Sequence, residues 1–138
     1  MPSSQETLAQ IHLFSDLSKA ELKKIERLMT PVDIKKGKEF ITEGKPGREA
    51  FILLEGTVSV HRGKRLIATL GPGDIIGEMS ILAGHPRSAT VRAETDIVCE
   101  VLDRREFSSL LDEVPTIARK IMVTAIKRLH DLDPGLAS

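Results

Sequence analysis

The sequence predicts a mainly β fold, a double-sheet jelly roll (β-roll) of about eight short strands with helices at both ends. Short apolar and β-branched runs recur between residues 32 and 102, and glycine-containing turns separate them. Helical apolar periodicity is confined to the segments on either side. The chain has 138 residues, enough for one core. We therefore expect a single domain over residues 1–138, with N-terminal helices in 1–30, the β-roll in 31–103 and C-terminal helices in 104–138.

Two helices are expected before the strands. Residues 7–14 suit a short amphipathic helix, and Ser18 with Glu21 forms the Ser-x-x-Glu capping box that starts the second one. We expect Pro31 to end that helix, because proline lacks an amide donor. The apolar positions of the second helix recur at helical spacing and form one docking face: Leu22, Ile25, Leu28 and Met29.

The strands are predicted from alternation and from the turns that bound them. Arg62-Gly63-Lys64 is typical of a hairpin turn between two of them. The expected strands are residues 32–34, 39–42, 50–54, 58–62, 66–70, 75–76, 88–93 and 96–102.

Two further helices are expected after the last strand. Asp103 is a suitable N-cap for the first, and Pro115 suits the first turn of the second. The apolar stripe of the final helix comprises Ala118, Ile121, Met122, Ala125, Leu129 and Leu132. Val123 and Ile126 widen this stripe beyond what one contact requires, so we expect the helix to contact a second copy or a partner protein.

Composition and charge limit the class of protein. The formal net charge is zero, so there is no electrostatic footprint for nucleic acid. No stretch approaches the roughly 20 apolar residues of a membrane span, and the N-terminus lacks the features of a signal peptide. A single cysteine, Cys99, excludes an internal disulfide framework and fits a reducing compartment. We expect a cytoplasmic protein that binds neither membranes nor nucleic acid.

The segment 71–91 combines features of an anion site. Residues 71–74 predict a tight turn, and residues 78–82 a short helix with an acid in its first turn. Pro86 disfavours continuation of that helix, and Arg87 follows it. Unpaired amides at a helix start and a guanidinium can together hold a phosphate.

The same segment resembles the phosphate-binding cassette of cyclic nucleotide-binding domains. These occur in the regulatory subunits of cAMP-dependent protein kinase, the bacterial catabolite activator protein and cyclic nucleotide-gated channels. Gly77-Glu78 and, at the family's distance, Pro86-Arg87-Ser88-Ala89-Thr90-Val91 carry the resemblance. It extends to residues 14–18, 43–47, 54–58 and 103–107 and to the helix from Pro115 onward. One departure is Arg48, where family members often carry aspartate at a surface turn.

The resemblance implies a receptor module for cAMP or cGMP with no catalytic role, no metal and no other cofactor. Glu78 would accept a hydrogen bond from the ribose 2′-hydroxyl, and Gly77 would let the backbone approach the sugar. The amides around Met79 and Ser80 and the Arg87 guanidinium would face the phosphate. The expected ligand-binding residues are Gly77, Glu78, Met79, Ser80, Pro86, Arg87, Ser88 and Ala89, with Leu129, His130 and Leu132 as candidate caps of the base.

Ser88 bears on the choice of base. Family members selective for cGMP often carry threonine at this position, kinase-type cAMP sites carry alanine, and the catabolite activator type carries serine with cAMP. The resemblance thus favours cAMP over cGMP. Ligand binding is expected to shift the position of the C-terminal helices.

Several alternatives stay open. Arg87 could form a structural ion pair with Glu78. The chain could also be a scaffold whose pocket binds nothing, and the presence of both Glu78 and Arg87 argues against that. A metal-dependent enzyme of the cupin type would need clustered histidines, but His12, His61, His85 and His130 show no paired spacing. A transcription factor of the catabolite activator kind would need a DNA-binding segment after the last helix, and this chain ends at Ser138. We expect no direct DNA binding.

Overall fold

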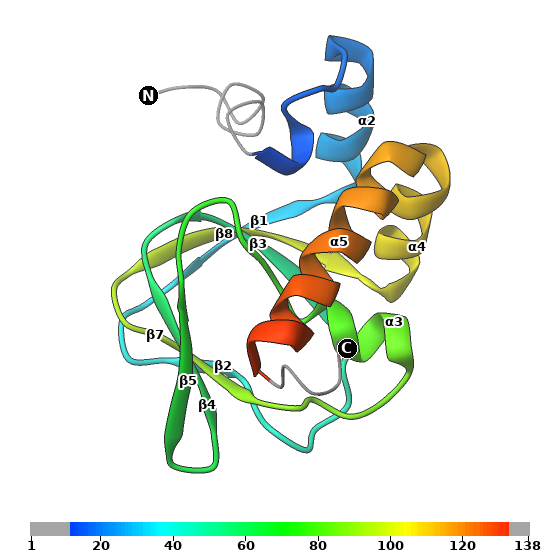
Figure 1. The fold of residues 1–138 in the computed structure, drawn as a ribbon. Coiled ribbons are helices and arrows are strands. Elements are labelled where there is room, and N and C mark those ends of the chain that lie inside the picture. Colours follow the sequence, from blue (N-terminus) through cyan, green and yellow to red (C-terminus); the bar gives the residue numbers. More distant parts are fainter. Residues whose placement is uncertain (1–11, 133–138) are drawn as a thin grey trace.

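The computed structural model describes residues 12–132, with side chains from Leu13 to Lys127. Within this range, two four-stranded antiparallel sheets form a β-roll and the longer helices lie together against one side of it (Figure 1). The strand orders are β1-β8-β3-β6 and β2-β7-β4-β5. The predicted double-sheet jelly roll of about eight strands with flanking helices is therefore confirmed.

The elements follow the predicted order with small differences in their bounds. They are a single 3-10 turn η1 (His12–Phe14), α2 (Lys19–Leu28), β1 (Thr30–Ile34), β2 (Glu39–Ile41), β3 (Glu49–Glu55), β4 (Val58–Arg62), β5 (Arg65–Leu70), β6 (Ile75–Ile76), α3 (Glu78–Ala83), β7 (Thr90–Ala93), β8 (Ile97–Asp103), α4 (Arg104–Glu113) and α5 (Pro115–Leu132). The helix expected over residues 7–14 is represented by η1 alone, since residues 7–11 lie outside the described part.

The start of α2 agrees with the sequence, and its end does not. The Ser18 hydroxyl accepts from the Glu21 amide at 3.1 Å, and the Ser18 amide donates to the Glu21 carboxylate at 3.0 Å. The helix ends at Leu28, before the proline that was expected to end it. Pro31 lies instead within β1, the edge strand of its sheet. An edge strand tolerates proline because one side of its backbone needs no ladder partner.

The core has two parts, and β3 belongs to both. Ala50 and Ile52 face the helices, where they join Phe14, Ile25 and Phe107. Their neighbours on the strand point the other way and fill the space between the sheets with residues of β4 and β8. Because side chains alternate along a strand, burial of both faces explains why residues 50–54 of β3 form an unbroken apolar run.

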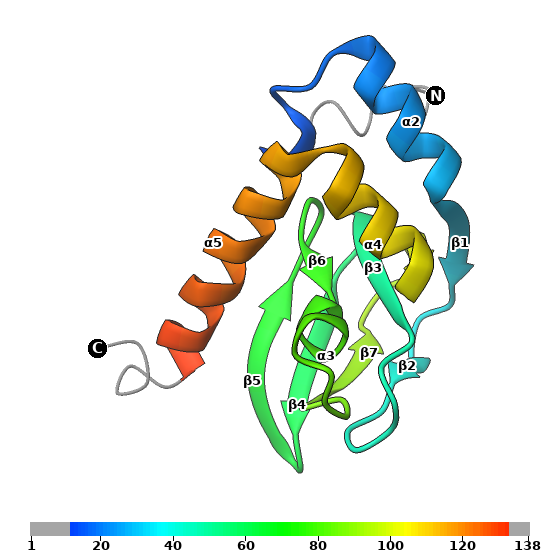
Figure 2. The ribbon, with the colours of Figure 1, turned by 90° about the vertical axis from the view of Figure 1, so that its right-hand side faces the viewer.

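The last helix spans from the helical layer to the β-roll. Its first half packs beside η1 and α4, and its second half extends along the open side of the roll (Figure 2). Lys120 Nζ lies 2.8 Å from Asp16 Oδ2, an ion pair that ties α5 to the turn after η1. Between residues 12 and 132, no helix combines the length and hydropathy that crossing a bilayer requires.

Candidate ligand-binding site

Gly77 marks the point where β6 gives way to α3. It is the N-cap of α3 with φ +84°, a left-handed conformation that side chains disfavour. A Cβ atom built there would lie 2.5 Å from Arg87 Nη1 and 3.1 Å from the Glu49 carbonyl oxygen. Both the backbone angle and the space therefore require glycine. A glycine N-cap also offers no side-chain acceptor to the amides of the first turn of α3.

Arg87 is held inside the roll by main-chain acceptors. Its side chain is only 8% exposed. Nη1 donates to the Gly77 carbonyl and Nη2 to the Glu49 carbonyl, both at 2.7 Å. These two bonds use two of the five guanidinium donors, and they orient the group without neutralising its charge.

The electrostatic surroundings of Arg87 include two opposing effects. Removal from water lowers the pKa of Arg87, because burial disfavours the charged form. The nearby carboxylates of Glu49 and Glu78 act in the opposite direction and favour the charge. The guanidinium is thus a buried cation whose two hydrogen bonds go to neutral carbonyls, with the carboxylates of Glu49 and Glu78 nearby.

The turn over residues 43–47 braces the cassette. The Gly44 amide donates to the Arg87 carbonyl and the Arg87 amide to the Lys45 carbonyl, both at 2.8 Å. A Cβ atom on Gly47 would overlap the side chain of Ser80. The sequence identified Gly47 only as a turn glycine, so its role beside the site was missed.

Ser80 and Glu78 are both buried within α3. The Ser80 hydroxyl donates to the His85 carbonyl at 2.5 Å and so closes the loop that returns to Arg87. Glu78 is 1% exposed, which is rare for a carboxylate.

One cavity of about 560 Å³ gathers most of the predicted residues, a volume within the usual range for small-molecule sites. Its polar side is formed by Gly77, Glu78, Met79, Ser80, Arg87, Ser88 and Ala89. The opposite side is mainly aliphatic and comprises Ile41, Val60, Ile67, Ala68, Thr69, Leu70, Ile76 and Val91. Arg62, His85 and Ala125 complete the lining. The exception among the predicted residues is Pro86, which is exposed and does not line the cavity.

The predicted caps of the base lie in a part of α5 whose side chains the structure does not describe. Leu129, His130 and Leu132 belong to the last turns of α5, whose side chains lie outside the described residues. Ala125, one turn earlier, does line the cavity. The helix that was expected to carry a cap therefore forms part of the cavity wall.

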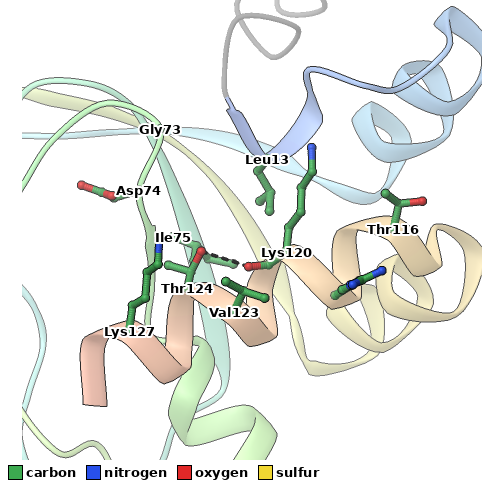
Figure 3. Close-up of a pocket in the computed structure, with 10 residues that line it drawn as sticks. Leu13, Gly73, Asp74, Ile75, Thr116, Lys120, Val123, Thr124 and Lys127 are labelled. Atoms are coloured by element: carbon green, nitrogen blue, oxygen red, sulfur yellow. Dashed lines mark hydrogen bonds between the residues drawn. The ribbon is translucent and has the colours of Figure 1, made fainter. Parts of the chain in front are cut away.

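A second cavity, of about 430 Å³, lies between α5 and the turn that precedes β6 (Figure 3). Its lining includes Gly73 and Asp74 from the turn and Lys120 and Thr124 from α5. The Thr124 hydroxyl donates to the Lys120 carbonyl at 3.0 Å. Because Thr124 lines this cavity and Ala125 lines the first, α5 is a wall shared by both, and its displacement would change both.

Among residues 12–132, no group of three or more His, Cys, Asp or Glu side chains is arranged so that it could hold a metal ion. Nε2 of His61 lies 2.9 Å from the Ser59 hydroxyl on the same strand, and Nδ1 of His85 lies 2.8 Å from the Pro86 carbonyl oxygen. These two histidines therefore have local partners.

Comparison with known proteins agrees with this geometry. A sequence model described as the cyclic nucleotide-binding domain matches residues 31–114, from the start of the β-roll to the end of α4. The chain belongs to the cyclic nucleotide-binding domain family. The predicted resemblance is confirmed, and the matched range contains the whole polar side of the larger cavity.

This domain covers only part of the length of its curated relatives. It is 36% identical over 121 residues to the cyclic nucleotide-gated potassium channel mll3241 of Mesorhizobium japonicum, covering 88% of this chain and 34% of the channel. It is 26% identical over 137 residues to the CRP-like cAMP-activated global transcriptional regulator of Mycobacterium tuberculosis, covering 96% of this chain and 61% of the regulator. The chain thus spans about one third of the length of the channel and less than two thirds of the length of the regulator.

A solved structure shares the fold over nearly the whole domain. It is described as Sp-2Cl-cAMPS bound to PKAR CBD2, and it superposes with a TM-score of 0.80 at 27% identity. The match covers 94% of this chain and 88% of that one. The helices that flank the β-roll are therefore part of the shared fold.

Proposed function

We propose that this domain is a cyclic nucleotide receptor, with cAMP favoured over cGMP, that performs no catalytic step and couples ligand binding to the position of its C-terminal helices. One observation carries the proposal. A single cavity brings together a buried guanidinium, a buried carboxylate and the start of a helix, and these match the phosphate and the ribose hydroxyl of a cyclic nucleotide.

The phosphate would lie between Arg87 and the first turn of α3. Both terminal nitrogens of Arg87 keep a further N–H beyond the bonds to Gly77 and Glu49. The amides of Met79 and Ser80 lie at the positive end of α3. A singly charged cyclic phosphate would thus meet donors from two directions, one of them a buried guanidinium.

The ribose would meet Glu78. An ionised carboxylate only accepts hydrogen bonds, so it is suited to the free 2′-hydroxyl. Its burial would make that hydrogen bond stronger than an exposed one.

The base would pack against the aliphatic side of the cavity. The sequence contains neither tryptophan nor tyrosine, so the purine would rest on side chains such as Val60, Ile67 and Leu70. Ser88 lies in the lining, and the family pattern at its position supports cAMP over cGMP. Both the CRP-like regulator and the PKAR structure are described with cAMP or a cAMP analogue, which supports the same preference.

The output would be a change in α5. Ala125 lines the cavity, so a ligand that binds one α5 position better than another shifts the population between them. Met122, Val123 and Ile126 are 59%, 47% and 56% exposed. Such an apolar band fits contact with a second copy or a partner protein. The single cysteine supports action in the cytoplasm.

Isothermal titration of the purified chain with cAMP and cGMP tests the proposal. We expect saturable one-to-one binding of both, tighter for cAMP, and a loss of about tenfold or more on Arg87→Lys, which keeps the charge but not the fork. Thermal unfolding of the variant controls for its fold. Binding of neither nucleotide by the folded wild-type chain would favour the non-binding scaffold and reject the proposal.

A further inference from the structure

Arg62 is a cavity residue that the motif does not contain. It is the last residue of β4 and was expected only to form part of a hairpin turn. On this strand Val60 lines the cavity, and Arg62, two residues further, shares its side of the strand. Arg62 lines the same cavity, and its Nε donates to the Ser88 carbonyl at 3.3 Å.

The hairpin that carries Arg62 is attached to the cassette. The Gly63 amide donates to the Glu43 carboxylate at 2.9 Å, and the Glu43 amide donates to the Thr90 hydroxyl at 3.0 Å. Thr90 begins β7 and lies within the cassette, three residues after Arg87. The position of Arg62 at the rim is therefore built by contacts between segments that lie far apart in the sequence.

We propose that Arg62 is a second cation for the phosphate of the ligand and strengthens the binding of either cyclic nucleotide through its charge. This inference rests on the proposed function. Among the described side chains that line the cavity, the formal charges at neutral pH, with histidine neutral, are those of Arg62, Glu78 and Arg87. Glu78 and Arg87 cancel formally. Within this lining Arg62 leaves one positive charge, and it offsets the carboxylate of Glu49, which acts on Arg87 from outside the lining and would oppose an anion.

The two arginines have different freedom. Arg87 is buried and bound to two carbonyls. Arg62 is exposed, and its one bond into the cassette is long for an N–H···O hydrogen bond. Its terminal nitrogens can therefore turn toward an anion beside Ser88 at little cost.

The main competing role for Arg62 is recognition of the base. Two guanidinium donors match the O6 and N7 acceptors of guanine but not the amino group of adenine. Such a contact would change the ratio of cGMP to cAMP affinity. The bond to the carbonyl of Ser88, the residue directly after Arg87, favours the phosphate side, so we expect that ratio to stay unchanged.

The test compares Arg62→Gln with the matched control Arg65→Gln. Arg65 pairs with Arg62 across the same hairpin and is exposed, but it does not line the cavity. Glutamine keeps an N–H donor at the position of Nε for the Ser88 carbonyl and removes the charge together with the two terminal nitrogens. Each variant is titrated with cAMP and with cGMP at about 0.01 M and about 1 M salt, where the screening length is about 30 Å and about 3 Å.

At low salt we expect Arg62→Gln to weaken binding of both nucleotides about three- to tenfold, and high salt to reduce this loss to less than about twofold. Arg62→Lys and Arg65→Gln should stay within about twofold of the wild type. A loss for cGMP alone would overturn the proposal in favour of base recognition. A loss that persists at high salt, or an equal loss in Arg62→Lys, would overturn it in favour of a structural brace.

Equal affinities of wild type and Arg62→Gln at low salt would also overturn it. These outcomes are distinct from failure of the proposed function, in which the wild-type chain itself binds neither nucleotide.

Discussion

The guanidinium of Arg87 occupies the space that a side chain on Gly77 would need. Nη1 lies 2.7 Å from the Gly77 carbonyl oxygen and 2.5 Å from the position of a Cβ on that residue. The glycine at the start of α3 and the arginine ten residues later are therefore one structural unit. Arg87 in this position thus leaves no room for a side chain on residue 77.

Gly77→Ala should weaken nucleotide binding by about tenfold or more and destabilise the fold by about 1–3 kcal/mol, since it adds backbone strain and displaces Arg87. Calorimetric titration and urea unfolding measure the two effects. Gly37→Ala is the matched control, because Gly37 has φ +90° with no atom within 4 Å of a Cβ. Equal binding losses in the two variants would show that displacement of Arg87 does not matter.

Gly47→Ala should destabilise the protein by about 1–3 kcal/mol, because the new methyl group would overlap the Ser80 side chain. Ser80→Gly removes that side chain at the expense of its bond to the His85 carbonyl. In a double-mutant cycle measured by urea unfolding, the double variant should therefore be more stable than the sum of the single effects. If the free-energy changes of the two single variants simply added in the double variant, the predicted overlap between residue 47 and Ser80 would be wrong.

Glu78→Gln should abolish most of the preference for a ribose over a deoxyribose. Wild type is expected to bind cAMP about tenfold or more tightly than 2′-deoxy-cAMP, since the charged acceptor strengthens the bond to the hydroxyl. The variant should bind the two with similar affinity. Retention of the full preference would assign the 2′-hydroxyl to another residue.

Glu100→Gln should stabilise the protein at pH 7 by about 1 kcal/mol. Burial raises the pKa of Glu100, and the nearby carboxylate of Glu26 raises it further. Glu26 Oε2 is itself buried without a hydrogen-bond partner in the described part of the chain. The folded state therefore holds the proton of Glu100 more tightly than the unfolded state does. The free energy of unfolding gains its full contribution from this proton below the pKa that Glu100 has in the unfolded chain. That contribution is lost as the pH rises through the pKa in the folded protein.

Urea unfolding between about pH 4 and pH 8 checks this sign. The wild type should lose stability over the range relative to Glu100→Gln, whose amide does not ionise. An advantage of the variant that is independent of pH would indicate a packing effect instead.

Much of the architecture was predictable because its signals are local. The Ser18–Glu21 capping box involves partners three residues apart and formed as expected. Asp103 caps its helix as expected, and the structure adds a capping box with Glu106 that was not predicted. Such contacts depend on short-range geometry that the order of residues already specifies. Pro31 was misjudged because proline is excluded from helix interiors and from central strands but is tolerated in an edge strand, and the sequence does not tell which strand lies at an edge.

The sequence by itself determined the β-roll, its flanking helices and the cassette with Glu78 and Arg87. The tertiary structure alone decided what surrounds them: the Glu49 carbonyl that holds Arg87, the contact between Gly47 and Ser80, and the place of Arg62 at the rim. The physical reason is the strand order, β1-β8-β3-β6 and β2-β7-β4-β5. This order brings together backbone atoms from segments that lie far apart in the chain. Contacts made by main-chain carbonyls and by glycines involve no side chain, so no sequence pattern predicts them.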